Sequence, residues 1–276
     1  MKKALVFFFF LIFAGSLFAG CSGSSSVYES GGVAWQYKSV SGGAAICPAY
    51  EKVGNRARKY NSPLSGTIRI PAELDGKKVV EIDAEAFVGC REITSLIIPE
   101  GVTEIGADAF SGCIQLSEIV LPDSLKYIGA NAFYETSVKS LLVPAQVRSF
   151  GEKDSETFYG CLSLREIMVS SDNPNYLSEN GVLFSRNKKA LLCYPAAKTG
   201  AAYEIPDTVE TIAAGAFSQN PYLERLYVPE SVRKVEDIFY GCDALTTVVV
   251  TERRASEYEK KGFFTPFDME IEPGDE

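Results

Sequence analysis

The chain has no histidine among its 276 residues. Histidine is the usual general base and the commonest metal ligand, so its absence excludes Ser-His and Cys-His catalytic devices. The glycine-rich motifs of nucleotide-binding loops are also missing. Carboxylates are abundant, and two pairs, Glu100 with Glu104 and Glu81 with Glu85, could be considered as acid–base partners. They fall in loops and outer turns, where solvated charge is the ordinary explanation, so we predict no enzymatic activity and no cofactor.

Basic residues are also in short supply. The sequence holds 27 Lys and Arg against 36 Asp and Glu, which gives a net charge of −9. Removing Lys2 and Lys3 with an N-terminal signal would leave 25 basic and 36 acidic residues and a net charge of −11. An acidic chain is repelled by phosphate backbones and by anionic lipids. We therefore expect no nucleic-acid partner and no electrostatic attachment to a membrane.

Only one long apolar run is present, and it lies at the N-terminus. Two lysines precede residues 4–13, and small residues lead from there to Cys21. A short basic head, an apolar core and a cleavage point describe a secretory signal. Because Cys21 directly follows Ala19 and Gly20, the segment resembles a bacterial lipobox, so we predict a lipoprotein signal peptide over 1–20 and lipidation of Cys21. The competing interpretation is an uncleaved membrane anchor.

The strongest pattern in the sequence is a repeat. Phe87, Phe110 and Phe133 are each 23 positions apart, and a fixed period of about 20 to 29 residues is typical of leucine-rich-repeat solenoids. An apolar pair with V-x-x-I spacing precedes each of six phenylalanines. The pairs are Val79 with Ile82, Val102 with Ile105, Leu125 with Ile128, Val147 with Phe150, Val209 with Ile212, and Val232 with Val235. The phenylalanines are Phe87, Phe110, Phe133, Phe158, Phe217 and Phe239.

Each repeat begins with a short predicted strand that ends at or near a proline, such as Pro99 or Pro122. Proline has no N–H to give to a ladder and so terminates a strand. Gly106 and Gly129 follow the inner isoleucine, where we expect a tight bend that needs backbone freedom. Residues 173–195 break the period and are predicted to form a hairpin insertion around a polar turn at 186–189.

The repeat resembles the BspA-like (treponemal-type) leucine-rich-repeat family of bacterial surface proteins. The pattern of that family, L-x-x-I-x-I-P, then V-t-x-I-G, then A-F-x-x-C, is matched over residues 65–251. The resemblance implies a β-rich, right-handed leucine-rich-repeat solenoid of short strands and short helical or 3₁₀ turns. It also implies a role in adhesion or protein binding, without specifying a ligand.

We predict a tether and two caps around this solenoid. Residues 21–32 are rich in Ser and Gly and are expected to form a flexible tether. Residues 33–64, with Trp35 and Tyr37, are predicted as an N-terminal cap. Residues 252–276, with a charged helix over 252–261 and an aromatic cluster, are predicted as a C-terminal cap. Caps are required because an open solenoid end exposes apolar surface.

Four cysteines, Cys90, Cys113, Cys161 and Cys242, hold the same position in the repeat and should form one interior column. Buried thiols acting as small apolar fillers are the plainer interpretation, and a bridge between Cys90 and Cys113 is the alternative. Their spacing does not fit a metal site. A calcium site at Asp172, Asn173 and Asn175 competes with a plain turn around Pro174.

A surface is the better functional candidate. In L-x-x-I-x-I the fourth and sixth residues face the core, so the fifth points outward. The outward residues are apolar or aromatic in all six units: Ile97, Val120, Leu142, Met168, Tyr227 and Val249. An exposed apolar stripe with a polar rim marks an interaction site, although β-branched residues suit strands wherever they face. We predict a surface-exposed, lipid-anchored cell-envelope protein that binds a host or extracellular-matrix protein ligand, with a non-adhesive structural scaffold as the alternative.

Overall fold

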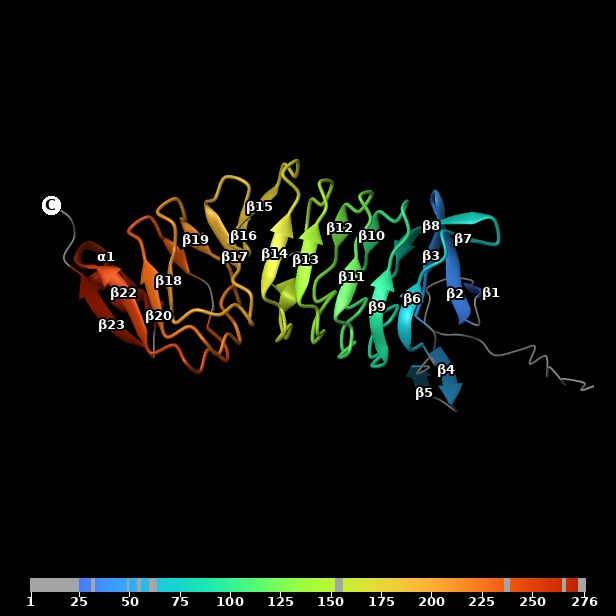
Figure 1. Ribbon diagram of the computed structural model, residues 1–276, viewed down its shortest axis with the longest axis horizontal. Coiled ribbons are helices and arrows are strands. Elements are labelled where there is room, and N and C mark those ends of the chain that lie inside the picture. Colours follow the sequence, from blue (N-terminus) through green and yellow to red (C-terminus); the bar gives the residue numbers. More distant parts are fainter. Residues whose placement is uncertain are drawn as a thin grey trace, which may run out of the picture.

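The computed structural model describes residues 25–272 apart from 31–32, 49, 54–55, 60–63, 152–155, 236–238 and 265–266. These residues form an elongated stack in which the chain advances by one repeat at a time (Figure 1). The predicted signal peptide and Cys21 lie outside the described residues. Within the described part of the chain, no helix has the length and apolar character needed to cross a membrane.

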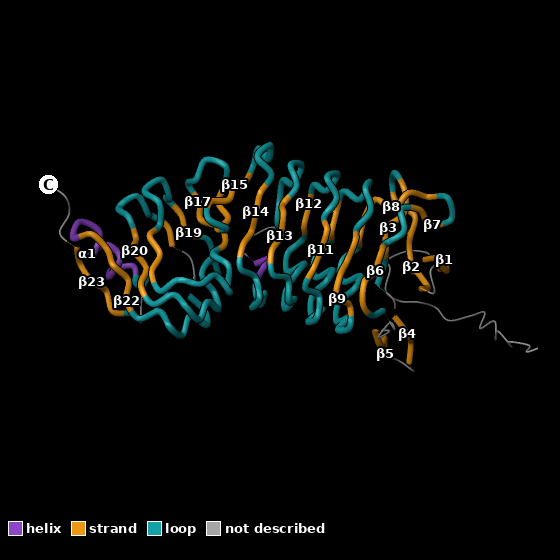
Figure 2. Tube along the Cα trace, in the orientation of Figure 1, coloured by secondary structure: helices purple, strands orange, loops and turns teal. Residues whose placement is uncertain are grey.

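Two rows of short parallel strands run along the stack, joined by loops and turns that make up much of the chain (Figure 2). The first row contains β6 (Gly66–Arg69), β9 (Ile93–Ile97), β11 (Glu118–Val120), β13 (Ser140–Val143) and β14 (Glu166–Val169), and it continues after an interruption with β18 (Ala202–Glu204), β20 (Arg225–Val228), β22 (Thr247–Thr251) and β23 (Asp268–Glu272). The second row contains β8 (Lys77–Ile82), β10 (Glu104–Ile105), β12 (Tyr127–Ile128), β17 (Ala190–Cys193), β19 (Thr211–Ile212) and β21 (Lys234–Val235). A short 3₁₀ turn, η1, spans Glu156–Phe158.

The pairing explains the period of the sequence. In the first row Leu96 pairs with Ile119, and in the second row Ile105 pairs with Ile128. Both pairs join residues one repeat apart, so equivalent side chains lie above one another in neighbouring turns. Each repeat therefore buries its apolar residues against the equivalent residues of the next, and the predicted solenoid of stacked repeats is confirmed.

The phenylalanines form a column in the core. The ring centroids of Phe87 and Phe110 are 5.3 Å apart, those of Phe110 and Phe133 are 5.9 Å apart, and the rings are nearly parallel. Phe158 continues this column at 6.3 Å from Phe133. A second column begins at Tyr194, whose centroid is 5.2 Å from that of Phe217, and reaches Phe239. The phenylalanines of equivalent repeat positions thus stack on one another, in two separate columns.

The two repeat glycines are needed for a different reason from the one the sequence suggested. Gly106 and Gly129 do not adopt positive φ; the left-handed residues of these turns are Asp108 and Asn131, each at φ 55°. A Cβ added to Gly106 would lie 2.4 Å from the backbone nitrogen of Ala84 in the preceding repeat, and Gly129 is equally crowded. Close approach of neighbouring turns, and not backbone freedom, therefore requires glycine here.

The interruption at residues 173–195 is a partition through the core. It contains β15 (Tyr176–Glu179), β16 (Val182–Ser185) and β17, which pair in antiparallel order, and β17 then pairs in parallel with β19. Leu183 packs into the N-terminal core cluster, whereas Val182 and Phe184 pack into the C-terminal one. Both faces of β16 are therefore buried, and the segment divides the solenoid into two halves.

The N-terminal elements extend the second row. β3 (Gly43–Ile46) pairs in parallel with β8, while β2 (Val33–Val40) pairs with β3 in antiparallel order. Trp35 is 4% exposed, and its ring meets Phe87 edge-on at 6.5 Å, so it closes the first aromatic column. Two short antiparallel pairings complete this end: β4 (Tyr50–Val53) with β5 (Arg56–Lys59), and β7 (Glu73–Leu74) with β8.

One N-terminal prediction is wrong. The tether predicted over 21–32 includes residues that form strand β1 (Ser25–Ser30), which pairs with β2 in antiparallel order. Ser25 accepts a hydrogen bond from the Nε2 of Gln36 at 3.1 Å. A serine-rich composition favours flexibility, but the unpaired edge of β2 offers six residues of backbone pairing that outweigh it.

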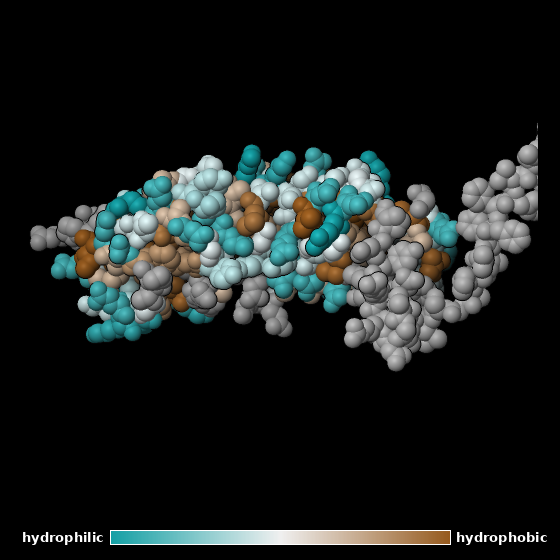
Figure 3. All heavy atoms as spheres, turned by 90° about the horizontal axis from the view of Figure 1, so that it is seen from below, coloured by the Kyte–Doolittle hydropathy of each residue, from teal (hydrophilic) through white to brown (hydrophobic). Residues whose placement is uncertain are grey.

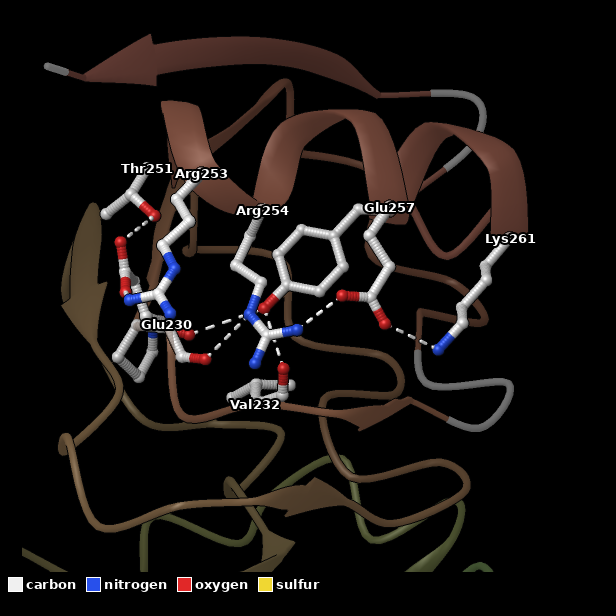
Figure 4. Close-up of polar contacts among 9 residues, drawn as sticks. Glu230, Val232, Thr251, Arg253, Arg254, Glu257 and Lys261 are labelled. Carbon is white, nitrogen blue, oxygen red and sulfur yellow. Dashed lines mark hydrogen bonds and ion pairs between the residues drawn. The ribbon is translucent and has the colours of Figure 1, made fainter. Parts of the chain in front are cut away.

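Helix α1 (Glu252–Lys261) and β23 close the C-terminal end (Figure 4). Tyr258 is 1% exposed, and its hydroxyl donates to the carbonyl of Val232 at 2.8 Å. The Nε of Arg254 donates to the carbonyl of Glu230 at 2.9 Å, and the Glu257 carboxylate accepts from Arg254 on the same helix. The helix is thereby fixed across the last aromatic column by one buried hydroxyl and a chain of charged contacts.

Candidate binding surface

Three apolar side chains are exposed on neighbouring strands of the first row. Val120 on β11 is 59% exposed, Leu142 on β13 is 56% exposed, and Met168 on β14 is 41% exposed. Leu142 and Met168 are direct register partners. In β13 the flanking Leu141 and Val143 are buried, so the outward direction of Leu142 follows from strand alternation. We call Val120, Leu142 and Met168 the strand-face patch.

The other predicted stripe residues do not share this exposure. Ile97 and Tyr227 are half-buried, and Val249 is only 3% exposed, which contradicts its predicted place on an open surface. The cause is an ion pair between Arg225 on β20 and Glu270 on β23. These strands flank β22, so the pair crosses over β22 between Thr247 and Val249 and covers both side chains.

The predicted stripe is also not continuous. Met168 and Tyr227 lie on strands of different sheets, and the segment with β15, β16 and β17 comes between them in the stack. Because both faces of β16 are buried, this segment offers no outward apolar residue to join the two halves. Among the described residues of the first row, the exposed large apolar side chains are therefore those of the strand-face patch, on the N-terminal side of the partition, and Ile271 on the terminal strand β23.

Polar residues border the strand-face patch. Glu118, Ser140 and Glu166 are exposed, each two residues before a patch residue on the same strand. A small apolar centre with a polar, partly acidic rim can desolvate against an apolar partner surface while the rim remains hydrated. The arrangement suits recognition of another macromolecule.

The carboxylates considered for acid–base chemistry have structural contacts. The Glu100 carboxylate accepts from the backbone N–H groups of Asp123 at 3.1 Å and Ser124 at 3.4 Å in the next repeat. Glu81 lies beside Glu104 in the parallel register, and burial together with the charge of Glu104 raises the pKa of Glu81. Glu100 thus stabilises a turn, and the like charges at Glu81 and Glu104 result from the stacking of equivalent positions.

Three of the repeat cysteines, Cys113, Cys161 and Cys242, are thiols that contact a backbone carbonyl of the preceding repeat. Cys113 and Cys90 are not joined by a disulfide. The Sγ of Cys113 lies 3.1 Å from the carbonyl oxygen of Phe87, and the Sγ of Cys161 lies 3.0 Å from that of Phe133. Burial raises the pKa of the Cys161 thiol to about 11. The thiol stays protonated at neutral pH and can donate to the neighbouring carbonyl.

At residues 172–175 the contacts favour the plain turn over the calcium site. Asn173 is fully buried, and its Nδ2 donates to the carbonyls of Pro144 and Val147 at 2.8 and 3.1 Å. Its Oδ1 accepts from the backbone N–H groups of Asn175 and Tyr176. The oxygen that would bind calcium therefore already accepts two backbone hydrogen bonds, as expected of the competing plain turn.

Sequence reasoning missed a second surface, at the turns that precede the first-row strands. Ile114, Leu162 and Tyr222 are 43%, 61% and 46% exposed there, and Figure 3 shows isolated hydrophobic residues on a largely hydrophilic underside. Leu162 and Tyr222 line a hollow of about 600 Å³ together with the basic residues Lys139, Arg165 and Lys198. The sequence did contain one indication of this surface, since Lys139 and Arg165 are basic residues at equivalent positions of two neighbouring repeats.

The fold and the patch define a leucine-rich-repeat protein of the solenoid type. The profile of the BspA type leucine rich repeat region matches the chain in six copies, over residues 80–186 and 199–265. The match covers more than half of the sequence, so the chain belongs to the BspA-type leucine-rich-repeat family. No curated protein matches the chain.

Solved structures show the same fold. The chain is similar to the pneumococcal vaccine antigen PcpA, with 18% identity and a TM-score of 0.58 over 82% of this chain and 81% of that one. It is similar to a leucine-rich cell surface protein of Faecalibacterium prausnitzii, with 21% identity and a TM-score of 0.51 over 92% and 97%. A leucine-rich-repeat protein of Eubacterium ventriosum gives 24% identity and a TM-score of 0.51 over 83% and 79%.

Proposed function

We propose that this protein is a lipid-anchored component of the bacterial cell envelope that binds a protein ligand through the strand-face patch. The observation that carries the proposal is the exposure of Val120, Leu142 and Met168 on three neighbouring strands. Exposed apolar side chains that adjoin one another cost solvation free energy and are typical of interaction sites. Extracellular-matrix or other host proteins are the partners that a surface-displayed adhesin would meet.

The proposed location depends on Cys21 and on display outside the cell. The lipobox-like residues before Cys21 support lipidation, and more than one acyl chain is needed for stable anchoring. The similarity to a protein described as a cell surface protein supports display. Metabolic labelling with a fatty-acid probe should mark the wild type but not a Cys21→Ala variant, and protease treatment of intact cells should remove the protein. Survival of the protein under protease treatment would favour the structural scaffold instead.

Binding itself is tested with charge insertion. The double variant Val120→Asp/Met168→Asp places two carboxylates in the strand-face patch without touching the core. The matched control is Val27→Asp/Ile271→Asp, since Val27 and Ile271 are 50% and 53% exposed on terminal strands. Biolayer interferometry against a panel of purified extracellular-matrix proteins should show binding by the wild type and the control only. Equal binding by all three proteins would sink the proposal, as would binding by none.

A further inference from the structure

The hollow lined by Leu162 and Tyr222, at the turns that precede the first-row strands, lies where the two halves of the solenoid meet. Its wall on one side comes from the starts of β13 and β14, where the Arg165 N–H donates to the Lys139 carbonyl at 2.9 Å. The other side is the segment 197–199. That segment is fixed by Asn220, whose Nδ2 donates to the carbonyl of Lys198 at 2.9 Å, and by the Ala197 N–H, which donates to the Leu164 carbonyl at 2.7 Å.

The lining is basic in an acidic protein. Lys139, Arg165 and Lys198 contribute the charges, and the hollow is lined by no carboxylate. Lys198 donates to the carbonyl of Asn180, whereas the side chains of Lys139 and Arg165 make no hydrogen bond or ion pair with any described residue. The equivalent position in other repeats holds Thr94, Ser117, Glu224 or Thr246. Basic residues therefore occupy this position in the last two repeats before the break.

Two basic residues at equivalent positions of neighbouring repeats are not enough to make a binding site, because a second basic pair in this protein is stacked in the same way. The Arg148 N–H donates to the Lys126 carbonyl at 2.8 Å beside the second row of strands. Like charges held side by side repel one another there as well. The pair at Lys139 and Arg165 differs because it faces a hollow with a third cation and with hydroxyl groups from Ser163 and Thr199. The pair at Lys126 and Arg148 is consequently an internal control.

We propose that this hollow binds the carboxylates of an acidic segment of a protein partner. Arginine and lysine are the donors that bind carboxylates in charge-assisted hydrogen bonds. Leu162 and Tyr222 are exposed beside the charges and provide apolar contact for a peptide. A long polyanion such as a sulfated polysaccharide would meet the net charge of −9 on the rest of the chain, whereas a short acidic segment would not.

This inference deepens the proposed function and depends on it in one respect, since it takes the partner to be a protein. Lys139 and Leu142 lie at β13, and Arg165 and Met168 lie at β14, so one partner could contact the hollow and the strand-face patch together. The two sites nevertheless use different chemistry. A peptide probe can therefore test the hollow without any matrix protein present.

The probe is a fluorescein-labelled peptide with four glutamates around a central leucine, compared with the same peptide carrying glutamines. Anisotropy titrations at low ionic strength use the wild-type protein, Lys139→Ala/Arg165→Ala, and the control Lys126→Ala/Arg148→Ala. The acidic peptide should bind the wild type and the control equally, and the hollow variant should bind about tenfold more weakly. Added salt should weaken the binding because the contacts are charge-dependent. The glutamine peptide should not bind.

Three results would overturn the proposal: no binding of the acidic peptide, equal weakening by both double variants, or tighter binding of a heparin fragment than of the peptide at the same site. A Val120→Ser/Met168→Ser variant separates this test from that of the strand-face patch. It should retain peptide binding, because it leaves the hollow unchanged. Normal matrix binding by the strand-face variants would sink the proposed function and leave the peptide result standing.

Discussion

The guanidinium of Arg225 on β20 donates two hydrogen bonds to the carboxylate of Glu270 on β23, and the one from Nη1 to Oε1 is 3.2 Å long. The two residues belong to strands that are not neighbours, since β22 lies between them. Arg225 also lies 6.0 Å from the ring centroid of Tyr227. The pair therefore covers Thr247 and Val249 on β22, whereas Val120, Leu142 and Met168 remain exposed on the N-terminal side of the partition.

This ion pair predicts a pH-dependent contribution to stability. The hydrogen bond from Arg225 lowers the pKa of Glu270 below the ordinary value of 4.5. Because the pKa is lower in the folded state, the contribution is present above the ordinary value and is lost as pH falls through the lowered one. Thermal unfolding of the wild type and of Glu270→Gln should differ at pH 7 and converge in acid. A difference that stays constant down to pH 3 would show that Glu270 does not titrate in this contact.

The aromatic column predicts a large loss of stability on truncation. Phe110 is fully buried between Phe87 and Phe133, so Phe110→Ala should lower the free energy of unfolding by about 3 to 5 kcal/mol. Ile114→Ala is the control on the same repeat, since Ile114 is 43% exposed and should change little. Urea titration followed by circular dichroism measures both. Similar values for the two variants would contradict the stacked core.

The raised pKa of Cys161 predicts slow alkylation in the folded protein. Burial keeps this thiol protonated and shields it from reagent. Cys90, at the same repeat position, is half-buried and should react faster with iodoacetamide at pH 8. Mass spectrometry of the digested protein gives both rates. In urea the two rates should become equal, and a faster reaction of Cys161 in the folded protein would disprove the packing described for this column.

The hydrogen bonds of the buried Asn173 side chain predict that its removal destabilises the protein. Its amide makes four hydrogen bonds, two to backbone carbonyls of the preceding repeat and two from backbone N–H groups at the start of the inserted segment. Asn173→Ala leaves these groups buried without partners and should cost about 2 to 4 kcal/mol in the free energy of unfolding. Asn187→Ala, at an exposed hairpin turn, is the matched control with a smaller expected effect. A calcium-dependent shift in the wild-type unfolding midpoint would instead revive a metal site here.

The fold was predictable from the sequence because stacking forces equivalent positions to share one environment. Ile105 and Ile128 pair directly, so selection for burial acts on both in the same way and leaves a visible period. The column of phenylalanines was predictable for the same reason. The helix over 252–261 was predictable because the sequence pattern of a single helix is local. The role of Gly106 was misinterpreted because a regular spacing of glycine looks the same in the sequence whether the residue allows a bend or a close approach between two repeats.

The site was less predictable, because its exposure depends on contacts outside the repeat. Val249 matches the outward position of Leu142 in sequence, but its exposure is decided by Glu270, on a strand that continues no repeat motif. The hollow depends on the path of residues 197–199, which leave the repeat and return to it. Alternation within a strand predicts direction, and only the neighbouring strands decide whether that direction leads to solvent.

The most direct test of the account is the oxidation rate of Met168 with and without a bound partner. Met168 is exposed in the strand-face patch, and Met269 on β23 is a half-buried internal reference. Hydroxyl-radical footprinting is carried out on the protein alone and with the matrix protein that binds it. We predict strong protection of Met168 on binding and an unchanged rate at Met269. An equal rate of Met168 oxidation in the free and bound states would contradict the claim that the strand-face patch is the binding surface.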